Sequence, residues 1–255
     1  MISRPVQARR LIAEYLGTML LVVAVVGSGI MADRLSPGDA GLRLLENSIA
    51  TMLALAVLIL VLGPVSGAHF NPVVTLADWW SHRRDIGAIG TVEAAAYVVG
   101  QVFGAVSGTV LANLMFGLPA VTWATTTRTA PHLWLGEVVA TGGLIVLIFA
   151  LIRSRRTQFA PVAVGAYIGA AYWFTSSTSF ANPAVTVGRA FTDTFAGISP
   201  NSVPAFVTFQ IIGAAVGLAV VAVLYPQPSA VVAAPAVEPL ADRQTANASP
   251  VRSPS

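Results

Sequence analysis

The chain has 255 residues, of which 55% are hydrophobic and only 10% are charged. Soluble domains average about a quarter charged residues, so this composition excludes an ordinary soluble domain and favours a membrane protein. The formal net charge of +3 reflects few charges with slightly more Arg than acid, which gives little support for nucleic-acid binding. The sequence contains no cysteine, which excludes disulfides, thiol catalysis and thiolate metal sites.

Hydropathy predicts six membrane-spanning segments, each close to the roughly 20 residues that a helix needs to cross a bilayer. Under this topology most Arg residues fall on one side, including Arg9, Arg83 and Arg153. The positive-inside rule then places both termini in the cytoplasm, and we expect a multi-pass protein of the plasma membrane. The predicted segments cover residues 11–32, 44–63, 92–116, 133–152, 159–177 and 203–225.

Landmarks in the first three segments recur in the last three, in the same order. Glu14 recurs as Glu137, an Asn-Pro pair follows the second and fifth segments, and Gln101 recurs as Gln210, at offsets of 123, 111 and 109 residues. Because each half holds three spans, the halves insert with opposite orientation, which is an inverted repeat. The expected parts are a cytoplasmic N-terminus (1–10), a first repeat (11–116), an extracellular connection (117–132), a second repeat (133–225) and a disordered Pro/Ala/Ser-rich tail (226–255).

Two Asn-Pro pairs interrupt uncharged runs that are too long for a single span. The pair at Asn71 lies inside the run 47–77, and the pair at Asn182 lies inside the run 157–188. Asn is a strong helix N-cap, and Pro at the next position has a preset φ and no N–H to leave unsatisfied. Each pair therefore predicts the start of a short helix within the membrane. Broken apolar segments in matching positions of two halves indicate a transport site.

Two short helices that enter from opposite faces would meet with their N-termini near the middle of the membrane. Their macrodipoles place partial positive charge there, and Asn71 and Asn182 supply amide donors. A neutral hydroxylated solute can accept from both side chains, whereas a cation meets a repulsive centre. We expect a pore centre of Asn71, Pro72, Val73, Asn182, Pro183 and Ala184, with pore-lining loop residues His69, Phe70, Phe180 and Ala181.

Three ionisable residues near this centre have more than one interpretation. Glu14 and Glu137 lie within predicted spans, where an acidic side chain is by default a functional candidate. They could be proton relays of a coupled transporter, or structural acceptors for backbone N–H groups of the re-entrant loops, and the second role is favoured. His69 could gate the pore with pH, although a fixed hydrogen bond is favoured.

The sequence carries no pattern of catalysis or metal binding. His69, His82 and His132 are widely separated, so no metal site is predicted. No nucleophile motif of the Gly-x-Ser-x-Gly kind is present. We therefore expect no enzyme activity, no cofactor and no nucleic-acid partner.

The two Asn-Pro pairs, the Glu-x-x-small-Thr sequences at Glu14 and Glu137, and Ser-Gly-Ala-His before the first pair carry a resemblance to a known family. Over residues of about 9–225 the chain resembles the aquaporin and aquaglyceroporin (major intrinsic protein) family. The resemblance implies an all-α membrane protein with six transmembrane helices, two re-entrant half-helices and an inverted 3+3 repeat. It also implies a passive channel that forms a homotetramer in the lipid bilayer.

The chain departs from the family pattern at two positions near the pore. The first motif reads Asn-Pro-Val, with Val73 where most relatives have Ala, and Val185 stands where most relatives have an Arg that projects into the outer filter. The other filter positions, carried over by their spacing from the motifs, are Thr51, Ala170 and Ser179. None of the four filter residues is aromatic or charged, so the resemblance implies a wide, neutral filter.

A wide and neutral filter suits uncharged solutes larger than water, such as glycerol-like polyols and undissociated metalloid acids such as arsenite. The chain is also similar to a bacterial subgroup linked to arsenic handling, with Val in place of the filter Arg and Asp-Thr-Phe-Ala-Gly downstream, here residues 193–197. Two alternatives stay open: an orthodox water channel, and a proton-coupled secondary transporter that uses Glu14 and Glu137.

Arg189 lies one helical turn after Val185 and also has two interpretations. It could restore a positive charge to the pore, displaced inward. Alternatively, it pairs with a carbonyl or with Asp193 at the far end of the half-helix, and this second interpretation is favoured.

Overall fold

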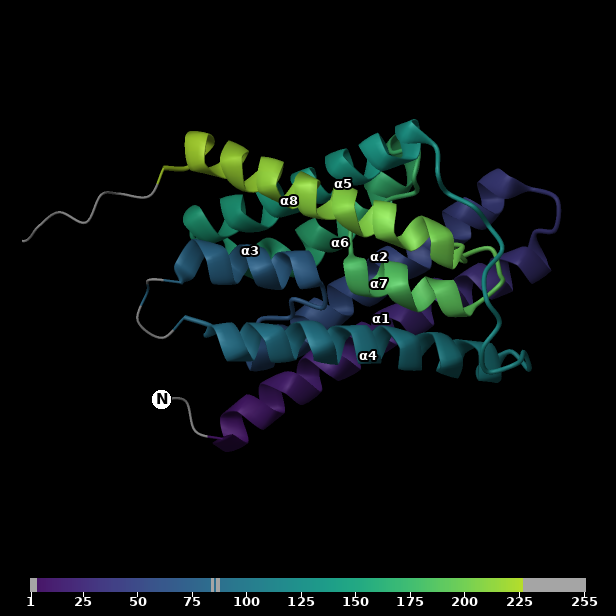
Figure 1. The fold of residues 1–255 in the computed structure, drawn as a ribbon, viewed down its shortest axis with the longest axis horizontal. Coiled ribbons are helices and arrows are strands. Elements are labelled where there is room, and N and C mark those ends of the chain that lie inside the picture. The colour runs from purple at the N-terminus through teal and green to yellow at the C-terminus, as the bar shows by residue number, and fades with distance from the viewer. Residues whose placement is uncertain (1–3, 84, 86–87, 227–255) are drawn as a thin grey trace, which may run out of the picture.

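The structure is a computed structural model that describes residues 4–83, 85 and 88–226, and this part of the chain is all-helical (Figure 1). Long helices run side by side and enclose two short ones. The long helices are α1 (Arg4–Leu35), α2 (Ala40–Ser66), α4 (Thr91–Met115), α5 (Pro131–Arg153), α6 (Ala160–Phe174) and α8 (Val203–Leu224); the short ones are α3 (Pro72–His82) and α7 (Pro183–Gly188), and 3-10 turns lie at Thr157–Phe159, Arg189–Phe191 and Pro200–Ser202.

The six predicted spans are confirmed as helices, although α1 and α2 are longer than predicted and α6 is shorter. In the described part of the chain, α1, α2, α4, α5 and α8 are long and apolar enough to cross a membrane. The remaining span, α6, has 15 residues because it ends at Phe174, where the chain turns into the loop before α7. The predicted segment 159–177 therefore extended into that loop. The predicted disordered tail, beyond Pro226, lies outside the described residues.

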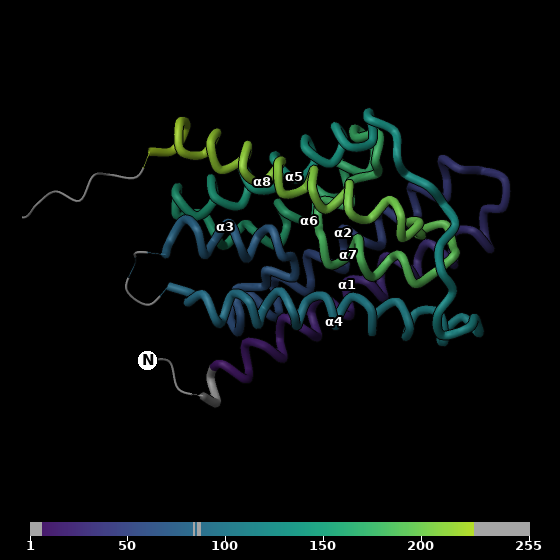
Figure 2. The backbone as a smooth tube through the Cα atoms, viewed as in Figure 1, coloured from purple at the N-terminus to yellow at the C-terminus, as the bar shows by residue number. Residues whose placement is uncertain are grey.

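The two halves of the chain have the same arrangement, and each contributes one short helix to the middle of the bundle. Figure 2 shows α3 and α7 on a common line, each running from the centre of the molecule toward an opposite end. Both begin at the centre, because each N-cap asparagine bonds to the loop of the other half, Asn71 to Ala181 and Asn182 to Phe70. The inverted repeat predicted from the sequence is therefore the architecture of the fold.

Glycines allow the long helices of each half to pack closely. The helix pair α1 and α4 and the pair α5 and α8 have extensive contacts. A Cβ atom added at Gly108 of α4 would lie 2.3 Å from the carbonyl oxygen of Met19, and one added at Gly217 of α8 would lie 2.6 Å from that of Gly142. Small residues four apart, as at Gly104 and Gly108, are the usual device for close helix contact within a bilayer.

Substituting Gly108 with Ala is expected to lower the stability of the protein. The added methyl group overlaps backbone atoms of α1, and overpacking of this kind costs about 1–3 kcal/mol. Thermal unfolding of the purified protein in detergent measures the effect. Gly100→Ala, in the same helix, is the matched control, because its added Cβ has no neighbour closer than 3.9 Å. Equal melting temperatures for the two variants would contradict close packing at Gly108.

Candidate functional site

Both half-helices begin at the predicted asparagine. The side chain of Asn71 accepts a hydrogen bond from the backbone N–H of Val73 at 3.1 Å, and that of Asn182 accepts from Ala184 and Val185 at 3.0 and 3.2 Å. Each asparagine has extended backbone angles, and a proline occupies the first turn that follows. The prediction of an Asn cap followed by a helix-initiating Pro is confirmed in both halves.

The asparagines also hold the two halves of the chain together at the pore centre. The amide nitrogen of Asn71 donates to the carbonyl oxygen of Ala181, and that of Asn182 donates to the carbonyl oxygen of Phe70, both at 2.8 Å. Each of these acceptors is the residue before the other asparagine. A carboxamide has two N–H donors. One donor on each side chain therefore braces the opposite loop, and the other can face a solute.

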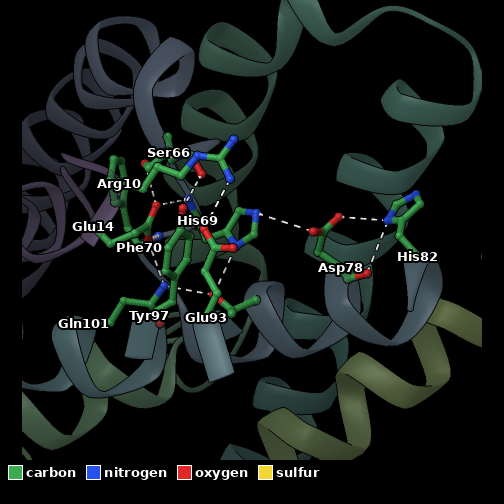
Figure 3. A network of polar contacts seen from close by, with 12 residues as sticks. Arg10, Glu14, Ser66, His69, Phe70, Asp78, His82, Glu93, Tyr97 and Gln101 are labelled. Carbon is green, nitrogen blue, oxygen red and sulfur yellow. Dashed lines mark hydrogen bonds and ion pairs between the residues drawn. The ribbon is translucent and has the colours of Figure 1, made fainter. Parts of the chain in front are cut away.

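The loop before α3 is held by a buried carboxylate from α1. Figure 3 shows Glu14 surrounded by donors from the loop and from α4. Its oxygens accept from the backbone N–H groups of His69 and Phe70 at 3.0 and 2.7 Å, from the hydroxyl of Ser66 at 2.7 Å and from the amide of Gln101 at 2.8 Å. The carboxylate is fully buried, so these bonds replace its hydration.

Glu137 of α5 does the same for the loop before α7. Its oxygens accept from the backbone N–H groups of Phe180 and Ala181, both at 2.9 Å, and from the amide of Gln210 at 2.6 Å. This carboxylate is also fully buried.

The two acids hold loop residues with unusual backbone angles. Phe70, bonded to Glu14, and Ala181, bonded to Glu137, have positive φ angles of 48° and 46°. Such angles are strained for residues other than glycine, and the hydrogen bonds to the acids fix them.

A threonine in each half-helix completes this arrangement, and the sequence interpretation missed it. Besides its bond to the acid, Gln101 donates to the hydroxyl of Thr75 at 2.9 Å, and Gln210 donates to that of Thr186 at the same distance. The glutamines were recognised as repeat landmarks, but no role was predicted for them. The signal was present in the sequence, because each threonine is four residues after its asparagine. Acid, glutamine and threonine together tie the long helices to the half-helices.

A cavity of about 160 Å³ passes both asparagines and connects the two half-helices. Its wall extends from Asp78 on α3 to Arg189 after α7, and it includes all the predicted loop residues: His69, Phe70, Phe180 and Ala181. The neighbours of the asparagines are placed differently. Four of these neighbours are buried and do not line the cavity: Pro72, Val73, Pro183 and Ala184. They support the asparagines from the side that faces away from the cavity.

One of the four predicted filter residues is wrong. Thr51, Ser179 and Val185 line the cavity, but Ala170 lies on the exposed outer face of α6. The cavity face of α6 carries Ile168 and Tyr172 instead. Residues four apart share one face of a helix, and the residue midway between them points away. That Thr51, Ser179 and Val185 form the selectivity filter stays a prediction from their spacing.

The correction at α6 changes the chemistry of the filter. Tyr172 is aromatic, and its hydroxyl donates to the hydroxyl of Thr51 at 3.3 Å, with both residues in the cavity wall. The cavity wall at this level therefore contains an aromatic side chain, which the sequence prediction did not include. The hydroxyl of Ser179 is buried in the wall and has no hydrogen-bond partner in the described part of the chain.

Arg189 combines parts of both interpretations. Its Nε donates to the carbonyl oxygen of Ala196, and its guanidinium lies 3.5 Å from the centre of the Phe180 ring. Pairing with Asp193 is wrong, because that carboxylate accepts from the backbone and hydroxyl of Thr125. Arg189 also lines the cavity. Since α7 runs away from the asparagines, the backbone of Arg189 is displaced outward from the pore centre rather than inward as predicted.

The opposite end of the cavity carries a cluster of polar side chains on and beside α3. Figure 3 shows Asp78 between His69 and His82. His82 Nδ1 lies 3.0 Å from one Asp78 oxygen, and His69 Nε2 lies 4.0 Å from the other. His69 Nδ1 lies 3.1 Å from the hydroxyl of Thr75, so the imidazole has a fixed hydrogen bond. The same residue also lines this end of the cavity. In the described residues no cluster of three metal-ligating side chains is found.

This fold and this cavity define a multi-pass membrane protein with an internal conduit between two capped half-helices. The chain belongs to the major intrinsic protein family, whose family model matches residues 1–179. It is 54% identical to aquaglyceroporin AqpS of Rhizobium meliloti (strain 1021) over 211 residues, which cover 83% of this chain and 88% of that protein. It is 32% identical to aquaporin A of Dictyostelium discoideum over 205 residues, 73% and 70% of the two chains.

A solved structure shows the same fold. The X-ray structure of the aquaglyceroporin from Plasmodium falciparum superposes with a TM-score of 0.63 and covers 84% of this chain and 95% of that one. The sequence identity is 22%, so this likeness concerns the fold alone. The family recognised from the Asn-Pro pairs is therefore confirmed by the sequence comparisons, and the predicted fold is confirmed by the structural one.

Proposed function

We propose that this chain is a passive channel for small uncharged solutes: water, glycerol-like polyols and undissociated metalloid acids such as arsenite. The observation that carries the proposal is the single cavity that passes the side chains of both Asn71 and Asn182. Each of these side chains keeps an N–H donor beyond the one that braces the opposite loop. A hydroxylated solute can replace its water shell with these donors, while the rest of the wall is largely apolar.

The composition of the filter supports solutes larger than water. Val185 provides a short apolar side chain in the cavity wall where most relatives have an arginine. Thr51 and Ser179 add hydroxyl groups to the same wall. A solute with several hydroxyls can therefore bond on one side and contact aliphatic carbon on the other, as a polyol requires. The relative AqpS carries the name aquaglyceroporin, which agrees with this selectivity.

The orthodox water channel is the second candidate, and one observation favours it. Tyr172 places an aromatic ring in the cavity wall, where its hydroxyl bonds to Thr51, and a bulky side chain at this position favours a solute as small as water. The proton-coupled transporter is disfavoured. Glu14 and Glu137 lie outside the cavity wall, and their oxygens accept hydrogen bonds from the loops and from glutamine side chains. A carboxylate engaged in this way is a structural support rather than a proton carrier.

The assembly and the location are part of the same proposal. We infer a homotetramer in the plasma membrane with both termini in the cytoplasm. The orientation rests on the Arg-rich loops of one side. The assembly rests on family resemblance and agrees with the apolar outer surface of α2, where Leu53, Val57 and Leu60 are exposed in the isolated chain. Such a surface needs lipid or another subunit as its cover.

Reconstitution into proteoliposomes tests the proposed function. We expect stopped-flow light scattering to show water flux and swelling by glycerol, and radiotracer or elemental measurement to show uptake of neutral arsenite, all above empty vesicles. Uptake should stop at equal concentrations inside and outside. Water flux without glycerol or arsenite uptake would establish the orthodox water channel instead. Accumulation against a gradient would establish a coupled transporter, and no flux of any solute would refute a channel.

A further inference from the structure

An arginine is buried beside the conduit at the end where the filter has lost its usual cation. Arg189 is only 3% exposed, yet it lines the cavity that also contains Val185 and Ser179. A charged side chain inside a membrane protein is costly, and by default it marks a functional position. The bond from its Nε to the carbonyl oxygen of Ala196 does not neutralise the charge. The guanidinium is therefore a fixed positive charge at the cavity wall.

The positive charge of Arg189 is not balanced by an acidic partner within the described ranges of the chain. Among the residues that the structure describes, no carboxylate forms an ion pair with it. Glu137, the nearby buried acid, is already bonded to the loop backbone and to Gln210. The two terminal nitrogens of Arg189 have no protein acceptor in this part of the chain, and the residue lines the cavity.

Phe180 holds the guanidinium in place. The Cζ atom of Arg189 lies 3.5 Å from the centre of the Phe180 ring, and this ring packs edge-on against Phe206. Arg128, from the loop before α5, lies 5.1 Å from the same ring centre. Burial lowers the pKa of Arg128, whose side chain is outside the cavity wall. A second cation is therefore close by, and it adds to the positive potential around Phe180.

We propose that Arg189, stacked on Phe180, is the residue that excludes cations from this conduit, in place of the arginine that Val185 replaces. This inference rests on the proposed channel function. The relocation separates two tasks: the charge is kept at the outer part of the conduit, while the position next to the asparagines is occupied by a small apolar side chain. Neutral solutes then meet a wall without a projecting arginine, and monovalent cations meet a repulsive charge.

Ion conductance in planar bilayers, measured on protein from the same preparation as glycerol swelling in vesicles, tests this inference. We expect the parent protein to conduct K⁺ and Na⁺ negligibly. Arg189→Gln is expected to raise cation conductance relative to glycerol flux by about ten-fold, because a unit charge near the path changes an ion's energy by a few kT. Arg189→Lys keeps a positive charge and is expected to keep cations out, which a purely structural role for Arg189 would not predict.

Arg128→Gln is the matched control, because it removes the neighbouring cation on the same ring without changing the cavity wall. Arg189→Met supplies a second neutral variant, with an unbranched stem that can still pack on Phe180. A conductance ratio that stays at the parent value in either neutral variant, with glycerol swelling present, would overturn the role of Arg189 and leave the channel function intact. An equal rise in Arg128→Gln would also overturn it, by showing that the charge of Arg189 has no special role in excluding cations. Absence of swelling in the parent would overturn the channel function itself.

Discussion

Replacing Glu14 with Gln is expected to abolish solute flux and to destabilise the fold by about 3–5 kcal/mol, since it removes the charge from a buried, fully bonded group. The carboxylate accepts from four donors, among them the backbone N–H groups of His69 and Phe70. A glutamine offers one acceptor oxygen, and its NH₂ group faces those donors. Because the carbonyl of Phe70 is bonded to Asn182, displacement of the loop reaches the pore centre. Thermal unfolding and glycerol swelling measure the two effects.

Glu93→Gln provides the matched control for this change. Glu93 lies on α4 and pairs with Arg10 at 3.2 Å near the beginnings of α1 and α4, away from the asparagines. The Arg10 side chain is 33% exposed, so solvent screens the pair, and its loss is expected to cost about 1 kcal/mol. Glu137→Gln should reproduce the effect of Glu14→Gln, because the two acids have equivalent partners. A Glu14→Gln protein with parental stability and passive swelling would show that the acid is not a structural support.

Most of the fold was predictable because local signals and the repeat agreed. Hydropathy located the six long helices, and the Asn-Pro pairs located the beginnings of α3 and α7. These signals are local: an N-cap bond spans two or three residues, as from Asn182 to Ala184 and Val185. The end of α6 at Phe174 was missed because the loop that follows, which begins Thr-Ser-Ser-Thr-Ser, carries no charged residue to mark the end of the span.

The filter was only partly predictable because its geometry depends on distant contacts. Counting residues back from Asn182 gave Ala170, but the path of the loop between α6 and α7 sets which face of α6 meets the cavity. Glu137 fixes that path through backbone bonds to Phe180 and Ala181. Such bonds join residues more than 40 positions apart, so spacing along the sequence does not encode them. Tyr172 was missed for this reason.

The cross-bonds between the asparagines and the opposite loops were hidden from the sequence for the same reason. Asn71 and Ala181 are 110 residues apart, and Asn182 and Phe70 are 112 apart. The sequence predicted that the side-chain amides of Asn71 and Asn182 are both free to bind solute. In the structure, one N–H group of each amide bonds to the opposite loop and joins the two halves of the chain. The pore centre is therefore a mechanical junction as well as a binding site, and its rigidity comes from both repeats together.

Val185→Arg is expected to reduce glycerol and arsenite flux by about ten-fold or more while reducing water flux less. The reason is that a long cationic side chain at this position would fill part of the cavity through which the solute passes. Val185 is 5% exposed and lines the cavity of about 160 Å³. The new guanidinium would also lie one helical turn from Arg189, and repulsion between the two cations would push it toward the open conduit. Parallel swelling measurements with water, glycerol and arsenite give the change in selectivity.

Val185→Met separates the contribution of volume from that of charge at this position. Methionine is unbranched and apolar, and it fills irregular space without adding a charge. If it lowers glycerol flux as strongly as Val185→Arg, the filter at Val185 discriminates by size alone. If only Val185→Arg loses glycerol and arsenite flux, then polyols pass because this position carries no charge. Parental glycerol and arsenite flux through Val185→Arg would show that Val185 does not border the narrowest part of the conduit, and the selectivity would then depend on Tyr172 and Thr51.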